Sequence, residues 1–571
     1  MYQDKYERWL HAKLEDSDLL PELLSIQGME EEIKDRFSVD LSFGTAGLRG
    51  VLGAGTNRMN IYMVRKATQG LANYLNGQPG GEKRVAISYD SRIKSDVFAR
   101  QAACVLAANG VKAYIYETLM PVPALSFATR QLHCDAGIMV TASHNPAKYN
   151  GYKAYGPDGC QMTEEAADAV YAQMQKTDAF DDVKLVDFDA ALADGKIESI
   201  GQDVIEALYD NIKAQSVRPG LCKTAGLKLV YSPLNGCGNI PVRRVLADIG
   251  ITDITIVPEQ ELPDGHFPTC PYPNPESRET LSLGLALAEK TGADLMLATD
   301  PDADRVGIAV KASEHDYRLL TGNEVGVLLL DYLCAARAEN GTMPKNPVMV
   351  KSIVSTNLAD VVAESYGVTP INVLTGFKYI GEQILLLEKA GEESRFLFGF
   401  EESYGYLAGT YVRDKDAVVA SMLICEMAAY YKSVGSSILQ QLDAIYKKFG
   451  RYLHKVDSFE FDGLSGMNTM KRIMDSLRAD APAAIAGYAV VKTSDYETHV
   501  TKDIVSGAQT VIDLPAANVL TYWLSNGACV IVRPSGTEPK IKVYYSTKGA
   551  DLAEAEAVQK QLSAAMRPLL G

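Results

Sequence analysis

The feature that most constrains the fold is a repeated alternation of short apolar runs with stretches of helical spacing. Residues 84–89 (RVAISY) have strand character, 95–109 has helical spacing, and two more strand-like runs follow at 111–116 and 136–141. Such alternation favours a mostly parallel α/β layer, because parallel strands need crossover connections that are usually helices. The pattern returns twice, from about residue 227 and from about residue 322. We therefore predict three α/β blocks of similar length, a pattern that is compatible with structural duplication.

The regions outside these blocks have a different character. Residues 5–37 predict helices rich in Glu, Lys and Leu, and the polar, acidic segment 171–215 has the helical spacing of a bridge between domains. Five prolines in 262–275 predict an irregular loop. Residues 451–571 have strand signals at both ends and contain helical stretches such as 466–478, which indicates a last domain of another type.

Length and composition set the broad class of the protein. At roughly 100–200 residues per domain, the 571 residues correspond to three to five domains. Hydrophobic residues make up 47% and charged residues 22%, which is close to the globular average and excludes a mostly disordered chain. The net charge of −16 argues against a general binder of nucleic acid or anionic membranes, but it allows a local basic pocket for a small anion.

The cysteines and the lack of membrane signals indicate the compartment. The nine cysteines form no CxxC pair and their number is odd, so reduced and mostly buried thiols are expected. The N-terminus is charged and amphipathic, without the apolar core of a signal peptide. No run reaches about 18 uninterrupted apolar residues. These features predict a cytoplasmic protein.

The first segment whose side chains suit a chemical function is the loop predicted at 141–159 (TASHNPAKYNGYKAYGPDG). The strand at 136–141 delivers Ser143 to this loop, and a hydroxyl at the carboxyl end of a strand is well placed to meet a ligand. His144, Lys148 and Lys153 add polar groups nearby. The alternative, an ordinary turn with a solvated serine, is equally compatible with this loop taken alone.

The second segment is 299–307 (TDPDADRVG), in which Asp300, Asp302 and Asp304 recur at every second residue. In an extended segment this spacing places three carboxylates on one side, and hard oxygen ligands suit Mg²⁺. An EF-hand loop is excluded, because Arg305 and Lys311 would stand where that loop needs Gly and Glu. A solvated acidic turn is the alternative, but unpaired carboxylates this close repel one another.

Two further segments carry groups that suit a phosphorylated sugar. In 398–406 (FGFEESYGY), Glu401, Glu402 and Ser403 offer partners for sugar hydroxyls, although helix capping by Ser403 is the favoured explanation of this segment taken alone. In 533–545 (RPSGTEPKIKVYY), an arginine, hydroxyls and turn amides match a phosphate cradle, and the alternative is a turn between two strands. One such segment occurs in each block, which indicates a phosphorylated sugar bound between four domains.

The motifs resemble, as a set, those of the α-D-phosphohexomutase superfamily. TASHNP, DPDADR, GFEES and RPSGTEP occur in the order and rough spacing of that family, and FGTAGLRG at 43–50 is similar to its opening motif. The resemblance covers nearly the whole chain and is greatest for the phosphoglucomutase-2-like branch. It implies a heart-shaped molecule with three related mixed α/β domains and a C-terminal α+β domain, at 1–210, 211–322, 323–450 and 451–571.

The resemblance also implies roles in phosphoryl transfer for residues of the first two blocks. Ser143 would be the phosphoserine, and its oxygen would bind Mg²⁺ together with Asp300, Asp302 and Asp304. Lys153 and His144 would lie beside the reacting hydroxyl, with Lys153 as a candidate acid or base. Arg305 and Arg49 would neutralise charge near the phosphoryl group.

For the last two blocks the resemblance implies roles in holding the sugar phosphate. Glu401 and Ser403 would bind sugar hydroxyls. A loop at 375–381 (TGFKYIG) matches the one that helps to set sugar preference. The phosphate that is not transferred would be held by the cradle. The members of these two loops are Thr375, Gly376 and Lys378 in the first, and Arg533, Ser535, Gly536 and Thr537 in the second.

The activity implied is that of a Mg²⁺-dependent phosphoglucomutase with one metal ion per chain and glucose 1,6-bisphosphate as intermediate and activator. Phosphopentomutase and phosphomannomutase are the sister alternatives, and Tyr404 after Glu-Glu-Ser departs from the GEMSG of dual mannose enzymes. A metal-dependent sugar phosphatase and a non-catalytic sugar-phosphate sensor are alternatives of other classes. The expected partners are small sugar phosphates, with no nucleic acid and no membrane, for a monomer or small homo-oligomer.

Overall fold

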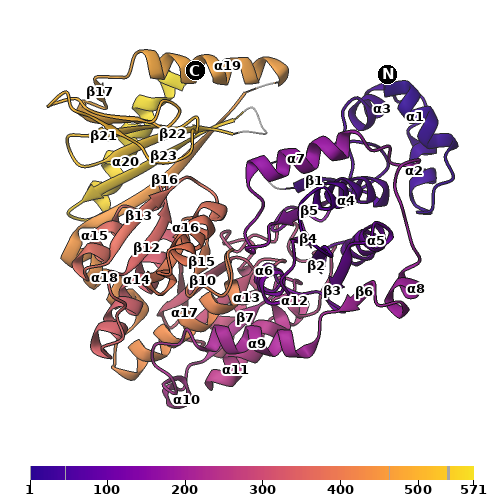
Figure 1. Ribbon diagram of the computed structural model, residues 1–571. Helices are drawn as coiled ribbons and strands as arrows, with labels where there is room; N and C mark the ends of the chain where they lie inside the picture. Colours follow the sequence, from indigo (N-terminus) through magenta and orange to yellow (C-terminus); the bar gives the residue numbers. More distant parts are fainter. Residues whose placement is uncertain (1, 45–46, 462, 536–539, 571) are drawn as a thin grey trace.

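The computed structural model describes residues 2–44, 47–461, 463–535 and 540–570, and its β-strands form four sheets that follow one another along the chain. Figure 1 shows the first sheet on the right, the last at the upper left, and the second and third below and between them. Strand β16 (Arg451–Glu460) follows the elements around the third sheet and is the first strand of the last sheet. The four sheets with their helices form the four domains described below.

The first domain contains a six-stranded sheet in the order β1-β5-β4-β2-β3-β6. Strands β4, β2, β3 and β6 are parallel to one another. At one side of the sheet β5 pairs antiparallel with both β4 and β1. Its elements are α1 (Tyr2–His11), α2 (Leu19–Ser25), α3 (Glu30–Phe37), β1 (Gly47–Val51), α4 (Ile61–Asn76), β2 (Arg84–Tyr89), α5 (Ser95–Ala108), β3 (Lys112–Ile115), α6 (Val122–Gln131), β4 (Ala136–Val140), β5 (Tyr149–Tyr155), α7 (Glu164–Gln175), α8 (Phe188–Ala193), β6 (Ile197–Ser199) and the connecting α9 (Gln202–Lys213).

The second domain repeats this plan in a five-stranded sheet, β11-β10-β9-β7-β8. Strands β9, β7 and β8 are parallel, and β10 and β11 extend the sheet antiparallel. Its elements are α10 (Cys222–Ala225), β7 (Leu229–Ser232), α11 (Asn239–Ile249), β8 (Ile254–Ile256), α12 (Pro258–Glu261), α13 (Ser282–Thr291), β9 (Leu295–Thr299), β10 (Val306–Ser313) and β11 (Asp316–Leu320).

The third domain has a four-stranded sheet, β13-β12-β14-β15, in which β15 is the antiparallel strand. The last domain has an antiparallel sheet in the order β16-β23-β22-β21-β18-β19-β20, with β17 paired to β18. The elements of the third domain are α14 (Gly322–Glu339), β12 (Val348–Ser352), α15 (Leu358–Ser365), β13 (Thr369–Val373), α16 (Phe377–Lys389), η1 (Glu393–Arg395), β14 (Phe396–Glu401), β15 (Gly405–Leu407), α17 (Ala417–Ser433) and α18 (Ile438–Phe449). Those of the last domain are β16 (Arg451–Glu460), α19 (Gly463–Ala479), β17 (Ala484–Ile485), β18 (Tyr488–Asp495), β19 (Val500–Asp503), β20 (Gln509–Val511), β21 (Leu520–Leu524), β22 (Cys529–Pro534), β23 (Lys540–Gly549) and α20 (Leu552–Leu570).

The first three domains place their functional loops at one equivalent position. In each sheet the last parallel strand turns into an antiparallel neighbour, from β4 to β5, from β9 to β10 and from β14 to β15. Every residue of β4, β9 and β14 is buried, as expected for strands covered on both faces. Each turn has one non-glycine residue in the left-handed region, with φ of 52° at Ser143, 48° at Ala303 and 65° at Tyr404. This shared plan supports the expected duplication.

The structure corrects three details of the sequence prediction. Parallel pairs predominate in the first and third sheets, as predicted, but each of the first three sheets ends in an antiparallel extension that the sequence did not indicate. Residues 149–155 are strand β5, not loop, so the predicted loop 141–159 is shorter. The segment 171–215 contributes β6 to the first sheet as well as helices. The predicted domain boundaries stay predictions, and α9 runs across the first of them, residue 210.

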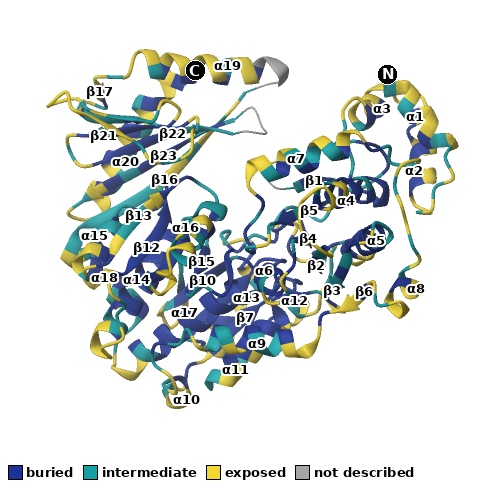
Figure 2. Ribbon diagram, viewed as in Figure 1, coloured by how far each residue is buried: buried dark blue, intermediate teal, exposed yellow. Residues whose placement is uncertain are grey.

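The buried apolar residues join three domains and leave the fourth more separate. One cluster runs from Ala86 in β2 to Ile445 in α18, across the first three domains, and Figure 2 shows this buried interior around α17 and β12. Another lies within the last domain, from Met470 to Leu570. A smaller cluster connects the third domain to the fourth. The last domain is therefore attached through a smaller apolar contact.

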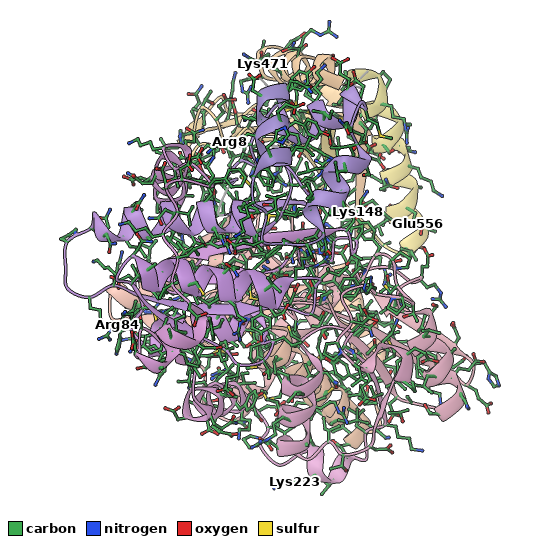
Figure 3. The ribbon with its side chains drawn as sticks, turned by 90° about the vertical axis from the view of Figure 1, so that its right-hand side faces the viewer. Arg8, Arg84, Lys148, Lys223, Lys471 and Glu556 are labelled. Atoms are coloured by element: carbon green, nitrogen blue, oxygen red, sulfur yellow. The ribbon has the colours of Figure 1, made fainter. Side chains whose placement is uncertain are left out.

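Charged and thiol groups are distributed as the composition predicts. Charged side chains such as Lys223 and Lys471 project from the outer surface (Figure 3). All nine cysteines are free and buried. Within the described residues no single helix is long and apolar enough to cross a membrane; α17 and α18 pass that test only as a pair, and they meet at 89°.

Candidate active site

Ser143 is held beside an acidic cluster of the second domain. Its Oγ donates a hydrogen bond to Asp300 Oδ2 over 2.9 Å, and His144 Nδ1 lies 3.1 Å from the same oxygen. Its backbone N–H donates to Thr141 Oγ1 over 2.8 Å. The side chain is mostly buried, with 9% of the residue exposed. The turn after β4 thus points a hydroxyl directly at the turn after β9.

Three carboxylates converge in the turn after β9. Asp300, Asp302 and Asp304 are buried, and each offers a carboxylate oxygen within 4.8 Å of the others. The predicted convergence is confirmed, but its expected cause, an extended segment, is wrong: residues 300–305 form a tight turn, with Ala303 left-handed. The backbone N–H groups of Asp304 and Arg305 donate to Asp300 Oδ1 over 3.2 and 3.0 Å, which stabilises the turn.

A half-buried ammonium group, that of Lys153, and a buried one, that of Lys415, offset part of this negative charge. Lys153 Nζ donates to Asp302 Oδ2 over 3.0 Å, and Lys415 Nζ lies 3.2 Å from Asp304 Oδ2. Burial by itself would raise the pKa of Asp302, but Lys153 lowers it below the ordinary value. Burial and the neighbouring carboxylates raise the pKa of Asp300 well above its ordinary value. The cluster retains an excess of acidic groups.

The donor set of this cluster fits a divalent cation. Asp302 Oδ1 and Asp304 Oδ1 are buried and have no hydrogen-bond partner among the described residues. Buried polar oxygens are normally hydrogen-bonded, and orphaned carboxylate oxygens next to one another are costly unless a cation joins them. Oxygen donors of this kind are those that Mg²⁺ prefers. The structure therefore contains a candidate metal centre made of three aspartates.

Arg305 and His144 connect the cluster to an open cavity. Arg305 Nη1 donates to Glu276 Oε1 over 3.2 Å, and its Nε lies 3.6 Å from Asp304 Oδ1. Burial, together with Arg305, lowers the pKa of His144 to about 3, so this imidazole is neutral at pH 7. Both side chains line a cavity of about 640 Å³.

All four domains contribute to this cavity. The first and second domains supply His144 and Arg305, the third supplies Thr375 and Ser403, and the last supplies Arg533. Thr375 Oγ1 is buried and has no hydrogen-bond partner in the part of the chain that the structure describes, so a ligand in the cavity can satisfy it. The volume is within the ~300–1,000 Å³ of typical small-molecule sites. Residues predicted from four separate motifs thus meet around one space large enough for a sugar phosphate.

The two glutamates of the third-domain motif have different environments. Glu401 is buried, and its Oε1 accepts a hydrogen bond from the backbone N–H of Gly376 over 2.7 Å. Burial raises the pKa of Glu401 to about 7, and the nearby Glu402 adds to this shift. Glu402 lines the cavity instead, and its Oε2 accepts hydrogen bonds from Ser352 and Ser355. In this structure Glu401 supports the loop at Gly376, and Glu402 faces the space.

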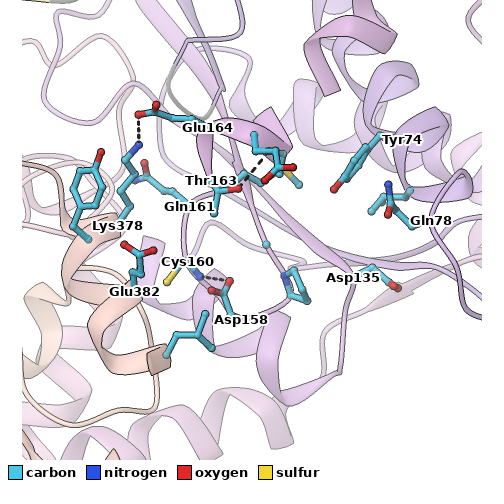
Figure 4. A pocket seen from close by; sticks show the side chains of 18 of the residues that line it. Tyr74, Gln78, Asp135, Asp158, Cys160, Gln161, Thr163, Glu164, Lys378 and Glu382 are labelled. Carbon is cyan, nitrogen blue, oxygen red and sulfur yellow. Dashed lines mark hydrogen bonds and ion pairs between the residues drawn. The ribbon is translucent and has the colours of Figure 1, made fainter. Parts of the chain in front are cut away.

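Lys378 lies apart from the other predicted residues. Its Nζ donates to Glu164 Oε1 over 2.9 Å, which joins α16 of the third domain to the start of α7 in the first. Figure 4 shows this pair at a second cavity of about 990 Å³, whose wall also includes Gln161 and Glu382. Thr375 and Lys378 therefore face two different cavities.

The remaining predicted residues lie at the edges of the site. Arg49 is exposed on β1, where it pairs with Gly151 of β5, and its charge helps to lower the pKa of His144. Ser535 follows β22, and its backbone N–H donates to the carbonyl of Lys540 over 2.7 Å. Gly536 and Thr537 lie outside the described residues.

Several residues around the site were missed by the sequence analysis. Lys415 pairs with Asp304 and Asp414, and Glu276 pairs with Arg305. A signal existed for both: VRDKD at 412–416 is a charged run directly before an apolar helix, and PYPNPE at 271–276 ends the irregular proline-rich loop. Neither run indicates which side chain turns inward.

Comparison with known proteins matches all four domains to one family. Models of phosphoglucomutase/phosphomannomutase α/β/α domains I, II and III match residues 40–181, 205–313 and 321–449, and the model of the C-terminal domain matches 478–565. A phosphoglucomutase of Staphylococcus saprophyticus is 36% identical over 525 residues, covering 92% of this chain and 94% of that protein. A phosphoglucomutase of Staphylococcus aureus is 35% identical, covering 91% and 92%.

Solved structures share the fold. The Paramecium phosphoglucomutase parafusin, in an open form, has a TM-score of 0.67 at 18% identity, covering 93% of this chain and 96% of that one. A phosphoglucomutase/phosphomannomutase family protein from Burkholderia thailandensis also has a TM-score of 0.67 at 18% identity, covering 92% and 97%. With four consecutive domain matches and relatives of similar length, this chain belongs to the phosphoglucomutase/phosphomannomutase family.

Proposed function

We propose that this protein is a phosphoglucomutase that interconverts glucose 1-phosphate and glucose 6-phosphate in the cytoplasm, through a phosphorylated Ser143. The observation that carries the proposal is the position of Ser143 Oγ, 2.9 Å from Asp300 in the triple-aspartate cluster. The four-domain cavity beside it gives the sugar phosphate a place to bind. Relatives named phosphoglucomutase, with about the same length as this chain, support the choice of glucose.

The reaction has two balanced transfers. In the first, the phosphoryl group on Ser143 moves to the 6-hydroxyl of glucose 1-phosphate: the bond from phosphorus to the serine oxygen breaks, a bond to the sugar oxygen forms, and the proton of the sugar hydroxyl passes to the serine oxygen. The product is glucose 1,6-bisphosphate, which turns over in the cavity. In the second, the 1-phosphoryl group moves to Ser143 Oγ, and glucose 6-phosphate is released. The enzyme regains its phosphoserine, so one turnover consumes no donor.

Side chains of the first two domains supply charge and hydrogen bonds for these transfers. Phosphoryl transfer depends mainly on positioning and charge neutralisation, and Lys153, Arg305 and Arg49 provide positive charge for it. His144 is neutral, and its Nδ1 lies 3.1 Å from Ser143 Oγ, close enough to form a hydrogen bond with that oxygen. Asp300, Asp302 and Asp304 would hold Mg²⁺, which when bound offsets the charge of the transferred group.

The third and fourth domains hold the rest of the substrate. Ser403 and Glu402 border the cavity with a hydroxyl and a carboxylate, which suit sugar hydroxyls. Arg533, which also lines the cavity, suits the phosphate that is not being transferred, because a guanidinium binds phosphate oxygens in pairs. Since the two phosphates exchange places between the transfers, one cradle serves both.

A coupled assay with separate sugar 1-phosphates tests the assignment. We expect kcat/KM for glucose 1-phosphate to exceed that for ribose 1-phosphate and mannose 1-phosphate. Mass spectrometry should find the mass of one phosphoryl group on the peptide that contains Ser143, and Ser143→Ala should abolish turnover. Ser199→Ala, on the exposed end of β6, is the matched control.

Three outcomes would contradict the proposal. Full turnover by Ser143→Ala would show that the reaction does not pass through a phosphorylated Ser143. A larger kcat/KM for ribose 1-phosphate would make the protein a phosphopentomutase. Release of free phosphate as fast as isomerisation would make it a phosphatase.

A further inference from the structure

The turn that presents Ser143 has an unfavourable backbone conformation. Ser143 has a φ of 52°, in the left-handed region that residues with a Cβ rarely occupy. Such a conformation persists only where the surrounding structure enforces it, and it is frequent at functional sites. The turn is only half-buried, and the carbonyl groups that it turns inward also need partners. The residue that enforces the turn therefore sets the position of the serine hydroxyl.

Arg92, which follows β2, provides these partners from one buried guanidinium. Nη1 donates to the carbonyls of Pro146 and Tyr149 over 3.0 and 2.9 Å. Nη2 donates to the carbonyl of Ser143 over 2.6 Å and also to that of Asn145. The Arg92 side chain has no exposed surface. Both terminal nitrogens are thus engaged with four carbonyls of the same short segment.

Asp90 links this guanidinium to the acidic cluster. Asp90 Oδ2 lies 3.4 Å from Arg92 Nε and accepts a hydrogen bond from Thr141 Oγ1 over 2.6 Å. Thr141 Oγ1 is also 3.1 Å from Asp302 Oδ2, and it accepts the bond from the backbone N–H of Ser143. A continuous polar network therefore runs from Arg92 to both the serine and an aspartate of the candidate metal centre.

The second domain fixes Arg92 from the other side. The guanidinium carbon lies 5.1 Å from the centre of the Phe267 ring, a cation–π contact with the irregular loop after α12. Gly265 of that loop approaches so closely that a Cβ there would lie 2.4 Å from the backbone N of Ile93. The position of Arg92 thus depends on the contact between the domain of the serine and the domain of the aspartates.

We propose that Arg92 is a positioning residue for phosphoryl transfer. Its guanidinium holds the turn 143–149 in the strained conformation and thereby sets Ser143 Oγ relative to Asp300. This inference rests on the proposed mutase activity through Ser143. A role in stability alone would lower the melting temperature without changing the turnover of the folded enzyme, whereas a positioning role lowers kcat and leaves the sugar-binding side chains in place.

Arg92→Lys tests this distinction, since lysine keeps the charge but has a single nitrogen that cannot reach four carbonyls in two directions. We expect kcat for glucose 1-phosphate to fall roughly 100-fold, the effect of a small misplacement of a reacting group, with KM changed less than about twofold. Arg65→Lys is the matched control. Arg65 is 4% exposed in the same domain and donates to Glu15 and Gln101, away from Ser143.

Chemical rescue adds a readout that a structural role would not move. In Arg92→Ala, low millimolar guanidinium should restore part of kcat, because its planar N–H groups can occupy the vacated space, and methylammonium should not. If neither Arg92 variant folds, Phe267→Leu decides the question: we expect kcat to fall at least about threefold with KM unchanged. Wild-type kcat in Phe267→Leu would then overturn the proposal.

The remaining outcomes separate this inference from the proposed function. An inactive wild-type enzyme would refute the mutase assignment itself. An active wild type with kcat of Arg92→Lys within about twofold of it would refute the inference alone. An equal loss of kcat in Arg92→Lys and Arg65→Lys would also refute it, because general destabilisation would then explain both.

Discussion

At the scale of single residues, the site concentrates buried charge that the protein does not fully pair. Lys153 and Lys415 contact the aspartate cluster, yet two carboxylate oxygens there lack hydrogen bonds among the described residues. Removing one partner from a buried charged group is costly, because the desolvation of the other group is no longer compensated. The cluster is therefore expected to depend on a bound cation.

Asp302→Asn tests this dependence, because it removes one charge with little change of shape. We expect added MgCl₂ to raise the melting temperature of the wild type but not of the variant, since a ligand stabilises only the state that binds it. Mutase activity should fall at least about 1,000-fold, in line with loss of a main electrostatic contribution. Asp316→Asn, on the exposed start of β11, is the control. An equal thermal response to Mg²⁺ in both variants would contradict the assignment.

Glu401 predicts a pH dependence of stability. Its pKa in the folded protein is about 7, raised by burial from an ordinary value of 4.5. The folded protein favours the neutral form of Glu401. The contribution of this group to the free energy of unfolding is therefore complete below its ordinary pKa and is lost as pH rises through about 7. Glu401→Gln mimics the neutral form and should match the wild type at low pH but melt at a higher temperature at pH 8. If the melting temperatures of Glu401→Gln and the wild type depended on pH in the same way from pH 5 to 8, this prediction would be refuted.

At the scale of elements, the turn between a parallel strand and its antiparallel neighbour recurs with different chemistry. The turn after β4 presents a hydroxyl, the turn after β9 presents carboxylates, and the turn after β14 leads to Ser403. The three sheets place these turns toward one another because the large apolar cluster fixes the first three domains together. The site is thus assembled from equivalent positions of similar sheets.

The start of α7 and the start of α16 form a contact with a predicted kinetic effect. Glu164 is 65% exposed in its ion pair with Lys378, so the pair should contribute no more than about 1 kcal/mol. If Lys378 must leave Glu164 to reach the sugar phosphate, Glu164→Gln should lower KM by up to about fivefold, since 1.4 kcal/mol corresponds to a factor of ten. The melting temperature should hardly change.

Glu165→Gln is the control for this contact, because Glu165 is the next residue of α7, has the same charge, and forms no ion pair with Lys378 in the described part of the chain. Steady-state kinetics with glucose 1-phosphate would measure both variants. A raised KM in Glu164→Gln would show instead that Glu164 orients Lys378 for binding.

At the scale of the whole molecule, the last domain has its own core and a smaller apolar contact with the third. Its cluster runs from Met470 to Leu570, and the contact cluster includes Val354 and Leu374 on one side and Cys529 and Ile531 on the other. Domains with separate cores can open independently. Because Arg533 belongs to this domain, the cavity is completed by the least integrated part of the molecule.

Hydrogen exchange at increasing urea concentration tests this separation. We expect amides of β21, β22 and β23 to lose protection at a lower urea concentration than those of β2 and β4. Glucose 1,6-bisphosphate should bring the two transitions closer, because a ligand that contacts both sides stabilises the closed arrangement. Coincident transitions without ligand would show a single cooperative unit instead.

The sequence by itself determined parallel strands such as β2, β4 and β9 and the candidate reacting groups, but it did not indicate β5 or β6. The run AGIMV became β4 and LMLAT became β9, because a short continuous apolar run is typical of a strand that is covered on both faces of its sheet. Ser143 and the three aspartates follow these strands directly, so their position at strand ends was readable from the order of residues. Motif resemblance then indicated the family that the domain matches confirmed.

Only the tertiary structure decided which side chains meet. Lys415 and Lys153 stand more than 100 residues from the aspartates they pair with, and Arg92 lies 51 residues from Ser143. Lys378, expected at the sugar, pairs with Glu164 across a domain boundary. Glu401, also expected at the sugar, accepts a hydrogen bond from the backbone N–H of Gly376. Local sequence fixes where a strand ends and which group follows it. The direction of a side chain and its charge environment depend on the packing of segments that are distant in sequence.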